Sequence, residues 1–302
     1  MESYIYLDTW VFSLRTDPPD FSRLSRFIGE ADLTILVDSL TLTELYNPSH
    51  TYSANDRAVA ASQLLGLHPS AIVEPLDVIL AELYAYPRQL PALPISLSST
   101  EVASHLRGEA ILMFLRRDPV FLALGKDVAE WAAQYADEKA SWLGSVDAII
   151  DHASSTNLLA KRPDGTIDPA LSNKEGFLQY LDRRYLRPEY HGAASQEERA
   201  SLTAHIAELA LGATAALPAL RLTSLMFWFA YVDVEQSSRT RKADSDIGDI
   251  YKAALAPYCT FFTTDKTMAR ILARATQNLA LNTSFLGPRD LTSLMEPPRS
   301  PV

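Results

Sequence analysis

The stretch from Asp246 to Asp265 constrains the fold of this chain more than any other. Apolar residues at helical spacing predict a helix over residues 246–256. Pro257 lacks an amide donor and restricts the residue before it, so we expect the helix to end there. The β-rich run at residues 259–263 predicts a short buried strand that ends just before Asp265. Ligands of open parallel sheets bind at the carboxyl ends of strands, so a site is expected here.

The opening third of the chain repeats this alternation. Short apolar runs predict strands at residues 4–7, 33–37 and 71–73. Between them, helical spacing predicts helices at residues 21–28 and 56–67, and a shorter helix that opens near Thr41. Strands that alternate with helices indicate a parallel sheet with helical crossovers.

The middle of the chain has a different character. After a proline-rich linker, capping boxes predict helices that begin at Ser98 and Ser195, a helical stripe predicts a helix over residues 127–153, and no strand is predicted. Its longest apolar run, residues 225–232, is far below the roughly 20 residues that span a bilayer, so we expect a buried helix. We therefore predict an α/β domain made of residues 1–76 and 236–302, with a mostly helical insertion at 77–235.

Composition narrows the classes of function. The single cysteine, Cys259, excludes an intramolecular disulfide and a cysteine-based metal site. The start of the chain lacks the positive region of a secretory signal, so we expect a reducing, cytoplasmic setting. The net charge of −10 argues against broad, non-specific nucleic-acid binding. It remains compatible with an enzyme that has a local basic rim around an acidic metal site.

Four carboxylates fall at equivalent places in the predicted elements. Asp8 ends the first strand, Glu44 follows the second, Asp246 opens the late helix, and Asp265 follows the last buried strand. In a parallel sheet these four side chains would converge at one edge and repel one another. Such clusters usually persist because a divalent cation neutralises them, and hard oxygen ligands suit Mg²⁺ or Mn²⁺.

These residues give the chain a resemblance to the PIN-domain family of metal-dependent nucleases. Residues 5–12, around Asp8, resemble the opening strand of that family, and Glu44 resembles its early glutamate. Asp246 and the run from Phe262 to Asp265 are similar to its closing pair of acids. The resemblance covers roughly residues 1–75 and 240–290 and implies a PIN-like sheet flanked by helices.

The resemblance also implies a function: Mg²⁺- or Mn²⁺-dependent hydrolysis of RNA by an endoribonuclease. The metal would bind a phosphate oxygen and activate a water for in-line attack. The implied ligands are Asp8, Glu44 and Asp246, with Asp265 completing the cluster or orienting the water. Two acids depart from the family pattern. Asp249 lies one turn after Asp246 and is a further candidate ligand, and Asp38 is an extra acid after the second strand.

Other polar residues would support this site. Thr9 and Thr263 are candidates for hydrogen bonds to it. The positive charge that binds the substrate would come from the loop before Asp246, which contains Arg239, Arg241 and Lys242. DNA stays open as a substrate. Toxins of toxin–antitoxin pairs share this domain, so a toxin-like role with an inhibitory protein partner is also open.

Each acid has a structural alternative. Asp8 and Asp265 would each cap the segment that follows, and Glu44 would form a capping box with Thr41. Asp246 and Asp249 would complement the dipole of a helix start. These alternatives account for each acid singly, but they do not predict four acids at one edge of a sheet.

Two functional alternatives remain. One is a catalytically degenerate PIN fold that serves as a binding scaffold. The other is a phosphohydrolase of the haloacid dehalogenase type with Asp8 as nucleophile, although Trp10 stands where that type needs a second aspartate.

Overall fold

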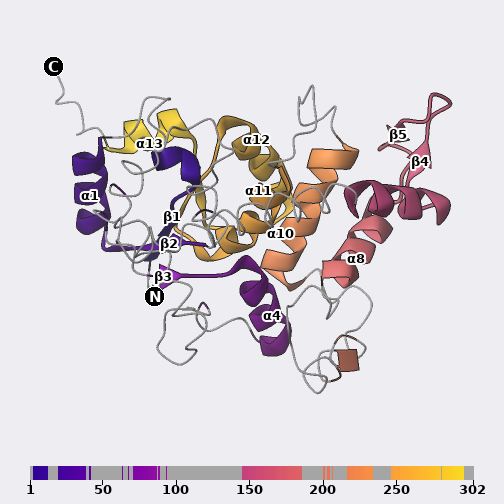
Figure 1. Ribbon diagram of the computed structural model, residues 1–302, viewed down its shortest axis with the longest axis horizontal. Helices are drawn as coiled ribbons and strands as arrows, with labels where there is room; N and C mark the ends of the chain where they lie inside the picture. Colours follow the sequence, from indigo (N-terminus) through magenta and orange to yellow (C-terminus); the bar gives the residue numbers. More distant parts are fainter. Residues whose placement is uncertain are drawn as a thin grey trace, which may run out of the picture.

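In the computed structural model the chain forms a five-stranded sheet whose strands all run parallel (Figure 1). The structure describes residues 3–12, 20–38, 41, 63, 67, 71–86, 88, 93, 145–185, 200, 203–204, 206, 216–233, 246–279 and 281–295. The sheet order is β3-β2-β1-β6-β7. The strands are β1 (Ser3–Tyr6), β2 (Leu33–Val37), β3 (Ala71–Ile72), β6 (Phe261–Thr263) and β7 (Ser284–Leu286). The predicted α/β class with a parallel sheet is confirmed.

Both faces of the sheet are buried, as expected for parallel strands. Because side chains alternate along extended chain, Ile5 of β1 and the following Leu7 enter one core, and Tyr4 and Tyr6 enter another. The first core contains helices α1 (Phe21–Glu30) and α13 (Pro288–Met295). The second core contains α4 (Pro75–Ala85), α10 (Pro218–Phe227), α11 (Asp246–Lys252), the 3-10 helix η5 (Ala253–Tyr258) and α12 (Lys266–Ala275).

Strands β1 and β6 are neighbours in the sheet. After β1 the chain moves toward one edge of the sheet, and after β6 it moves toward the other edge. From β1 it passes through α1 on one face to β2, and from β6 it passes through α12 on the other face to β7. The strand order therefore reverses between β1 and β6. Open α/β sheets bind ligands outside the carboxyl ends of their strands at such a point. This arrangement selects one place in the fold for a site.

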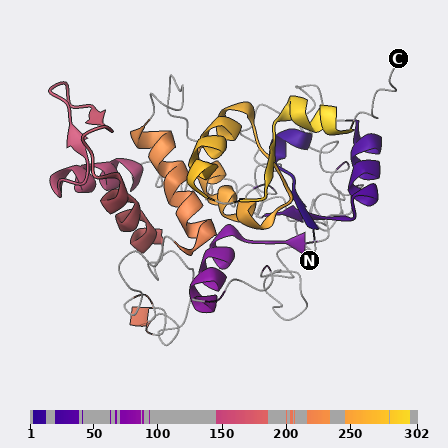
Figure 2. The ribbon, with the colours of Figure 1, turned by 180° about the vertical axis from the view of Figure 1, so that it is seen from behind.

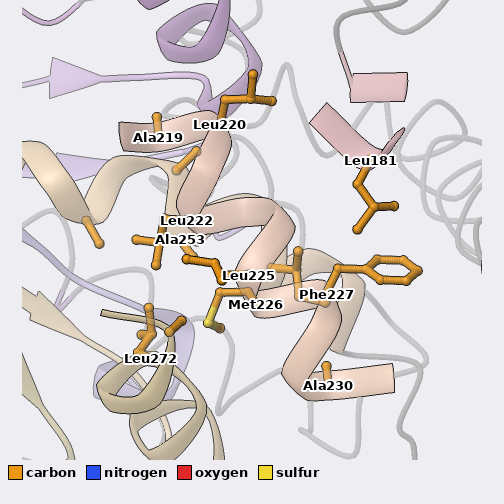
Figure 3. Close-up of a cluster of buried hydrophobic side chains, with 14 of the residues drawn as sticks. Leu181, Ala219, Leu220, Leu222, Leu225, Met226, Phe227, Ala230, Ala253 and Leu272 are labelled. Carbon is orange, nitrogen blue, oxygen red and sulfur yellow. The ribbon is translucent and has the colours of Figure 1, made fainter. Parts of the chain in front are cut away.

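Helix α10 is the most buried helix of the described chain, with nine of its residues in the interior. It continues as a π-helix, η4 (Trp228–Val232), so the predicted buried helix over this apolar run is confirmed. Figure 3 shows Met226 on the side of Leu272 in α12, whereas Phe227 points toward α8 (Lys174–Tyr185).

Helix α8 is held to α10 by polar contacts as well as by aromatic packing. Ser224 donates to the buried Asp182 carboxylate at 2.5 Å, and the Arg221 guanidinium lies 3.4 Å from its other oxygen. The Phe177 and Phe227 rings lie 6.1 Å apart. One core therefore runs from the sheet through α10 to α8 (Figure 2). The predicted division of the chain into an α/β domain and an insertion stays a prediction.

Three sequence-based expectations need correction. The central region does contain strands: β4 (Ala160–Lys161) and β5 (Ile167–Asp168) form an antiparallel pair. Two residues are too few for a strand pattern, and the pair depends on a turn in which Gly165 has a φ of +85°. Pro257 does not end the late helix but lies inside η5, and the strand starts only at Phe261. Pro257 is the fifth of the six residues of η5, so its missing amide removes only one of the last helical hydrogen bonds, and the helix ends one residue later at Tyr258.

Several predicted helices lie wholly or largely outside the described residues. These are the helices near Thr41 and at 56–67, and those that begin at 98, 127 and 195. Within the described part of the chain, no helix is long and apolar enough to cross a membrane.

Candidate functional site

Asp8 follows β1 at the point where the strand order reverses. The alternation that puts Tyr4 and Tyr6 on one face puts Asp8 on the same face, where α11 packs. Its backbone amide donates to Thr263 Oγ1 at 2.7 Å, and the Thr263 hydroxyl donates to the Tyr6 carbonyl at 3.0 Å. The predicted supporting role of Thr263 therefore has a geometric basis, since it joins β1 to β6 beneath Asp8.

The Asp8 side chain is buried, with 10% of its surface exposed. Its Oδ1 atom accepts a hydrogen bond from the Thr9 amide at 2.8 Å, at the start of the 3-10 helix η1 (Thr9–Phe12). This contact is with the first residue of η1, whereas an N-cap side chain bonds to the second or third, so it is not the capping contact of the structural alternative. It leaves the carboxylate with further acceptor capacity, because an ionised aspartate has about four lone-pair sites.

Lys252, the last residue of α11, places a buried positive charge next to Asp8. Its side chain is only 2% exposed, and its Nζ atom lies 3.0 Å from Asp8 Oδ1 and 3.8 Å from Asp249 Oδ1. Asp249 and Lys252 are three residues apart, so they share one face of the helix. Taking an ammonium ion out of water costs several kcal/mol, which its pairing with carboxylates offsets. The two acids therefore converge on one buried positive charge.

A third acid, Asp38, directly follows β2 and lies near this pair. It is fully buried, accepts from the Tyr6 hydroxyl at 2.8 Å, and accepts from the Thr41 amide at 2.5 Å. Burial, and then the negative charge of Asp38, raise the pKa of Tyr6 well above its ordinary value, while Lys252 lowers it. Tyr6 therefore stays protonated and donates to Asp38. The phenol lies within electrostatic reach of both Asp8 and Lys252.

Asp265 has a clear structural role. It is exposed, and its side chain accepts from the Thr267 amide at 2.6 Å and the Met268 amide at 2.8 Å. These contacts cap α12, so the capping alternative is confirmed. Its place two residues after Thr263 still sets it at the carboxyl edge of the sheet. Its described hydrogen bonds are with α12 and not with Asp8.

The remaining predicted site residues are outside what the structure describes. Asp246 opens α11 as expected, but its side chain is not among the described atoms. Glu44 and the basic residues Arg239, Arg241 and Lys242 are also outside the described ranges. Of the two candidate acids in α11, Asp249 is the one whose position beside Lys252 is known.

The described residues contain no group of three or more histidine, cysteine or acidic side chains placed to hold a metal ion. The donors that are described have suitable chemistry, because Asp8 and Asp249 offer hard carboxylate oxygens around one positive charge. In the structure the cation that these two carboxylates contact is the Lys252 ammonium group. The contributions of Glu44, Asp246 and Asp265 to a metal site stay predictions.

The sequence did not reveal two members of this site. Lys252 follows a charged helix start, so its sequence position suggests an exposed residue, and Tyr6 reads as core. One signal was available for the lysine. It lies one turn after Asp249 and directly before the apolar run at residues 253–256, which places it on a helix that is largely buried.

Another buried acid lies elsewhere in the same core. Glu82 of α4 is 3% exposed and accepts hydrogen bonds from the amides of Ala219 and Leu220 and from the Tyr258 hydroxyl. It therefore caps α10, whose own N-cap residue Leu217 makes no side-chain cap. Burial is the main cause that raises the pKa of Glu82 to about 7. Tyr258 precedes β6, so this cluster is at the opposite end of the strand from Thr263.

Comparisons with protein-family models, with curated proteins and with solved structures gave no match to this chain.

Proposed function

We propose that this chain is a divalent-metal-dependent endoribonuclease of PIN-like fold, with its site at Asp8. The observation that carries the proposal is the convergence of Asp8 and Asp249 on one buried positive charge at the reversal point of a parallel sheet. Parallel α/β sheets bind ligands at this point. The described fold is compatible with the PIN-like architecture that the sequence resembles.

In this proposal Mg²⁺ or Mn²⁺ is held by Asp8 and Asp249 together with Glu44 and Asp246. When bound, the ion supplies charge stabilisation at the phosphate and a more acidic water. The chain's own residues hold the acids in place. Thr263 fixes the backbone of Asp8 to β6, and the Thr9 amide orients its carboxylate.

Substrate binding is proposed for the loop before α11. Arg239, Arg241 and Lys242 would supply positive charge to an otherwise acidic protein whose net charge is −10. Phosphate contacts of this kind depend on salt and carry little sequence information. RNA is the proposed substrate, and single-stranded DNA is the comparison that tests this preference.

The test is cleavage of a labelled RNA by the purified chain in Mn²⁺. We expect cleavage that EDTA abolishes and that Asp8→Asn lowers by about 100-fold or more, with the circular dichroism spectrum unchanged. Asp151→Asn is the matched control, because Asp151 is an exposed aspartate in the helical middle of the chain. Cleavage by Asp8→Asn at the wild-type rate, or cleavage by wild type in EDTA, would refute the mechanism.

A second function, a binding scaffold without catalysis, is favoured by one observation. Lys252 Nζ already lies between Asp8 and Asp249, where it neutralises charge that a metal would otherwise neutralise. A chain that relies on this lysine alone would take up no Mn²⁺. Titration calorimetry of the wild-type chain with Mn²⁺ separates the two functions.

A further inference from the structure

We propose that Lys252 is a built-in counter-ion that competes with the divalent metal for Asp8. It rests on the proposed function and adds a positioning residue that the sequence did not predict. In the metal-free chain Lys252 would hold Asp8 and Asp249 together, and metal binding would require its ammonium group to leave Asp8.

Lys252 is buried to a degree that is unusual for a lysine. Lys252 is among the largest fully buried side chains of the described structure, and it lies at the end of a helix whose Ile247 and Ile250 are also buried. Lysine is almost never fully buried unless it is paired. Its pairing with Asp8 at 3.0 Å explains why the sequence tolerates it there.

The charges around Lys252 are mostly negative. Three acids surround this place, Asp8, Asp38 and Asp249, and the described cation that contacts two of them is Lys252. Tyr6 donates to Asp38, which stabilises that carboxylate separately. The positive charge of Lys252 is therefore directed at the two acids that the proposed function assigns to the metal.

The Lys252 ammonium group contacts the same Asp8 oxygen that a bound metal ion would use. A divalent ion binds carboxylate oxygens at about 2.0 to 2.6 Å. Asp8 Oδ1 is the atom that Lys252 Nζ contacts at 3.0 Å, so an ion on that oxygen would lie within a few ångströms of the ammonium group. Like charges at about 4 Å repel strongly at the edge of a protein. The ammonium group and the ion are therefore alternative occupants, and the lysine lowers the affinity of the site for metal.

The test compares the Mn²⁺ dissociation constant of the wild-type chain with that of Lys252→Met, by titration calorimetry. Methionine keeps an unbranched apolar stem and removes the charge. We expect Lys252→Met to bind Mn²⁺ about tenfold more tightly or better, because the competing charge is gone. Lys161→Met is the matched control, since it also breaks a lysine–aspartate pair, but one whose side chains are 46% and 75% exposed. Its dissociation constant should equal that of wild type.

Each possible result either supports or overturns the proposed role of Lys252. Equal or weaker Mn²⁺ binding by Lys252→Met, with wild type binding and cleaving normally, overturns the role of Lys252 and leaves the proposed function intact. No Mn²⁺ binding by either chain overturns both. If Lys252→Met unfolds in EDTA, refolding on addition of Mn²⁺ supports the competition, because metal then replaces the missing cation. A variant that stays unfolded at saturating Mn²⁺ overturns it.

Discussion

Two of the buried acid clusters in the described part of the chain satisfy their carboxylates in different ways. At the carboxyl edge of the sheet, Asp8 is paired with the buried ammonium group of Lys252. In the core beneath α10, Glu82 is surrounded by neutral donors from the chain: two backbone amides and the Tyr258 hydroxyl. Both clusters join elements that are distant in the sequence, but only the first brings a second acid, Asp249, to the same lysine.

The difference separates a structural acid from a candidate functional one. Glu82 has enough donors for a cap, and its raised pKa follows from burial without a compensating cation. In the first cluster, Asp8 and Asp249 both contact Lys252, and Asp38 lies nearby, where it accepts from Tyr6. Acids that come together at the reversal point of a parallel sheet lie where such sheets bind ligands.

Removal of charge should therefore affect the two clusters unequally, and this is the largest expected effect on stability. In EDTA, Lys252→Met should lower the free energy of unfolding by roughly 3–5 kcal/mol, because it leaves buried carboxylates without their cation. Glu82→Gln should change it by less than about 1 kcal/mol above pH 7, since an amide keeps an acceptor and loses a costly buried charge. Urea denaturation measures both. Equal losses would remove the distinction between the clusters.

The pH dependence of stability should come from Glu82. Its folded pKa of about 7 exceeds the ordinary value of 4.5, so between these pH values the folded state binds more protons than the unfolded state. Stability from this group is full below pH 4.5 and falls as the pH rises to 7, by at most about 3 kcal/mol. The difference in unfolding free energy between wild type and Glu82→Gln should follow this curve. A difference that does not vary with pH would contradict the account.

Tyr258→Phe tests how the neutral donors act. The Tyr258 hydroxyl donates to Glu82, which favours the ionised carboxylate, and the pKa of Tyr258 is itself raised by burial and by Glu82. The variant should lose about 2 kcal/mol of stability above pH 7, where the acceptor is charged, and about 1 kcal/mol below pH 4.5. Urea denaturation at the two pH values checks this, and a larger loss at the lower pH would argue against the assigned hydrogen bond.

Substitution of Asp265 should have the smallest effect on stability, and it separates the capping role of this residue from a role in the proposed site. Because Asp265 is the N-cap of α12, Asp265→Ala should lower the free energy of unfolding by about 1 kcal/mol. Asp265→Asn should lower it by only a few tenths, since asparagine caps equally well. If Asp265 also serves the proposed site, Asp265→Asn should lose RNA cleavage while keeping its melting temperature. Normal cleavage by this variant would restrict Asp265 to capping.

Much of the fold follows from local patterns in the sequence. The apolar runs of β1 and β2 and the stripe of α1 predict these elements because burial on fixed faces leaves a period in the chain. The order of the strands was not predictable, because it depends on which face each crossover helix takes. The hairpin β4–β5 was missed because two residues show no period, and η5 because a proline usually marks a helix end.

The site was predictable only in part. Asp8 and Thr263 could be found because each follows or ends a recognisable strand. Lys252 was not assigned, because a single lysine near a helix end usually points to solvent, and the apolar run after it was the one signal that its helix is buried. The capping role of Asp265 was one of the alternatives that the sequence offered. The contributions of Glu44 and Asp246 stay predictions.

The account depends most directly on Mn²⁺ binding at Asp8. Titration calorimetry of the wild-type chain should show Mn²⁺ uptake, and Asp8→Asn should abolish it while leaving the circular dichroism spectrum unchanged. The Asp151→Asn control, which alters an exposed aspartate, should bind as wild type does. Absence of uptake by the wild-type chain, or equal uptake by Asp8→Asn, would contradict the account and favour a fold that uses this edge of the sheet as a scaffold.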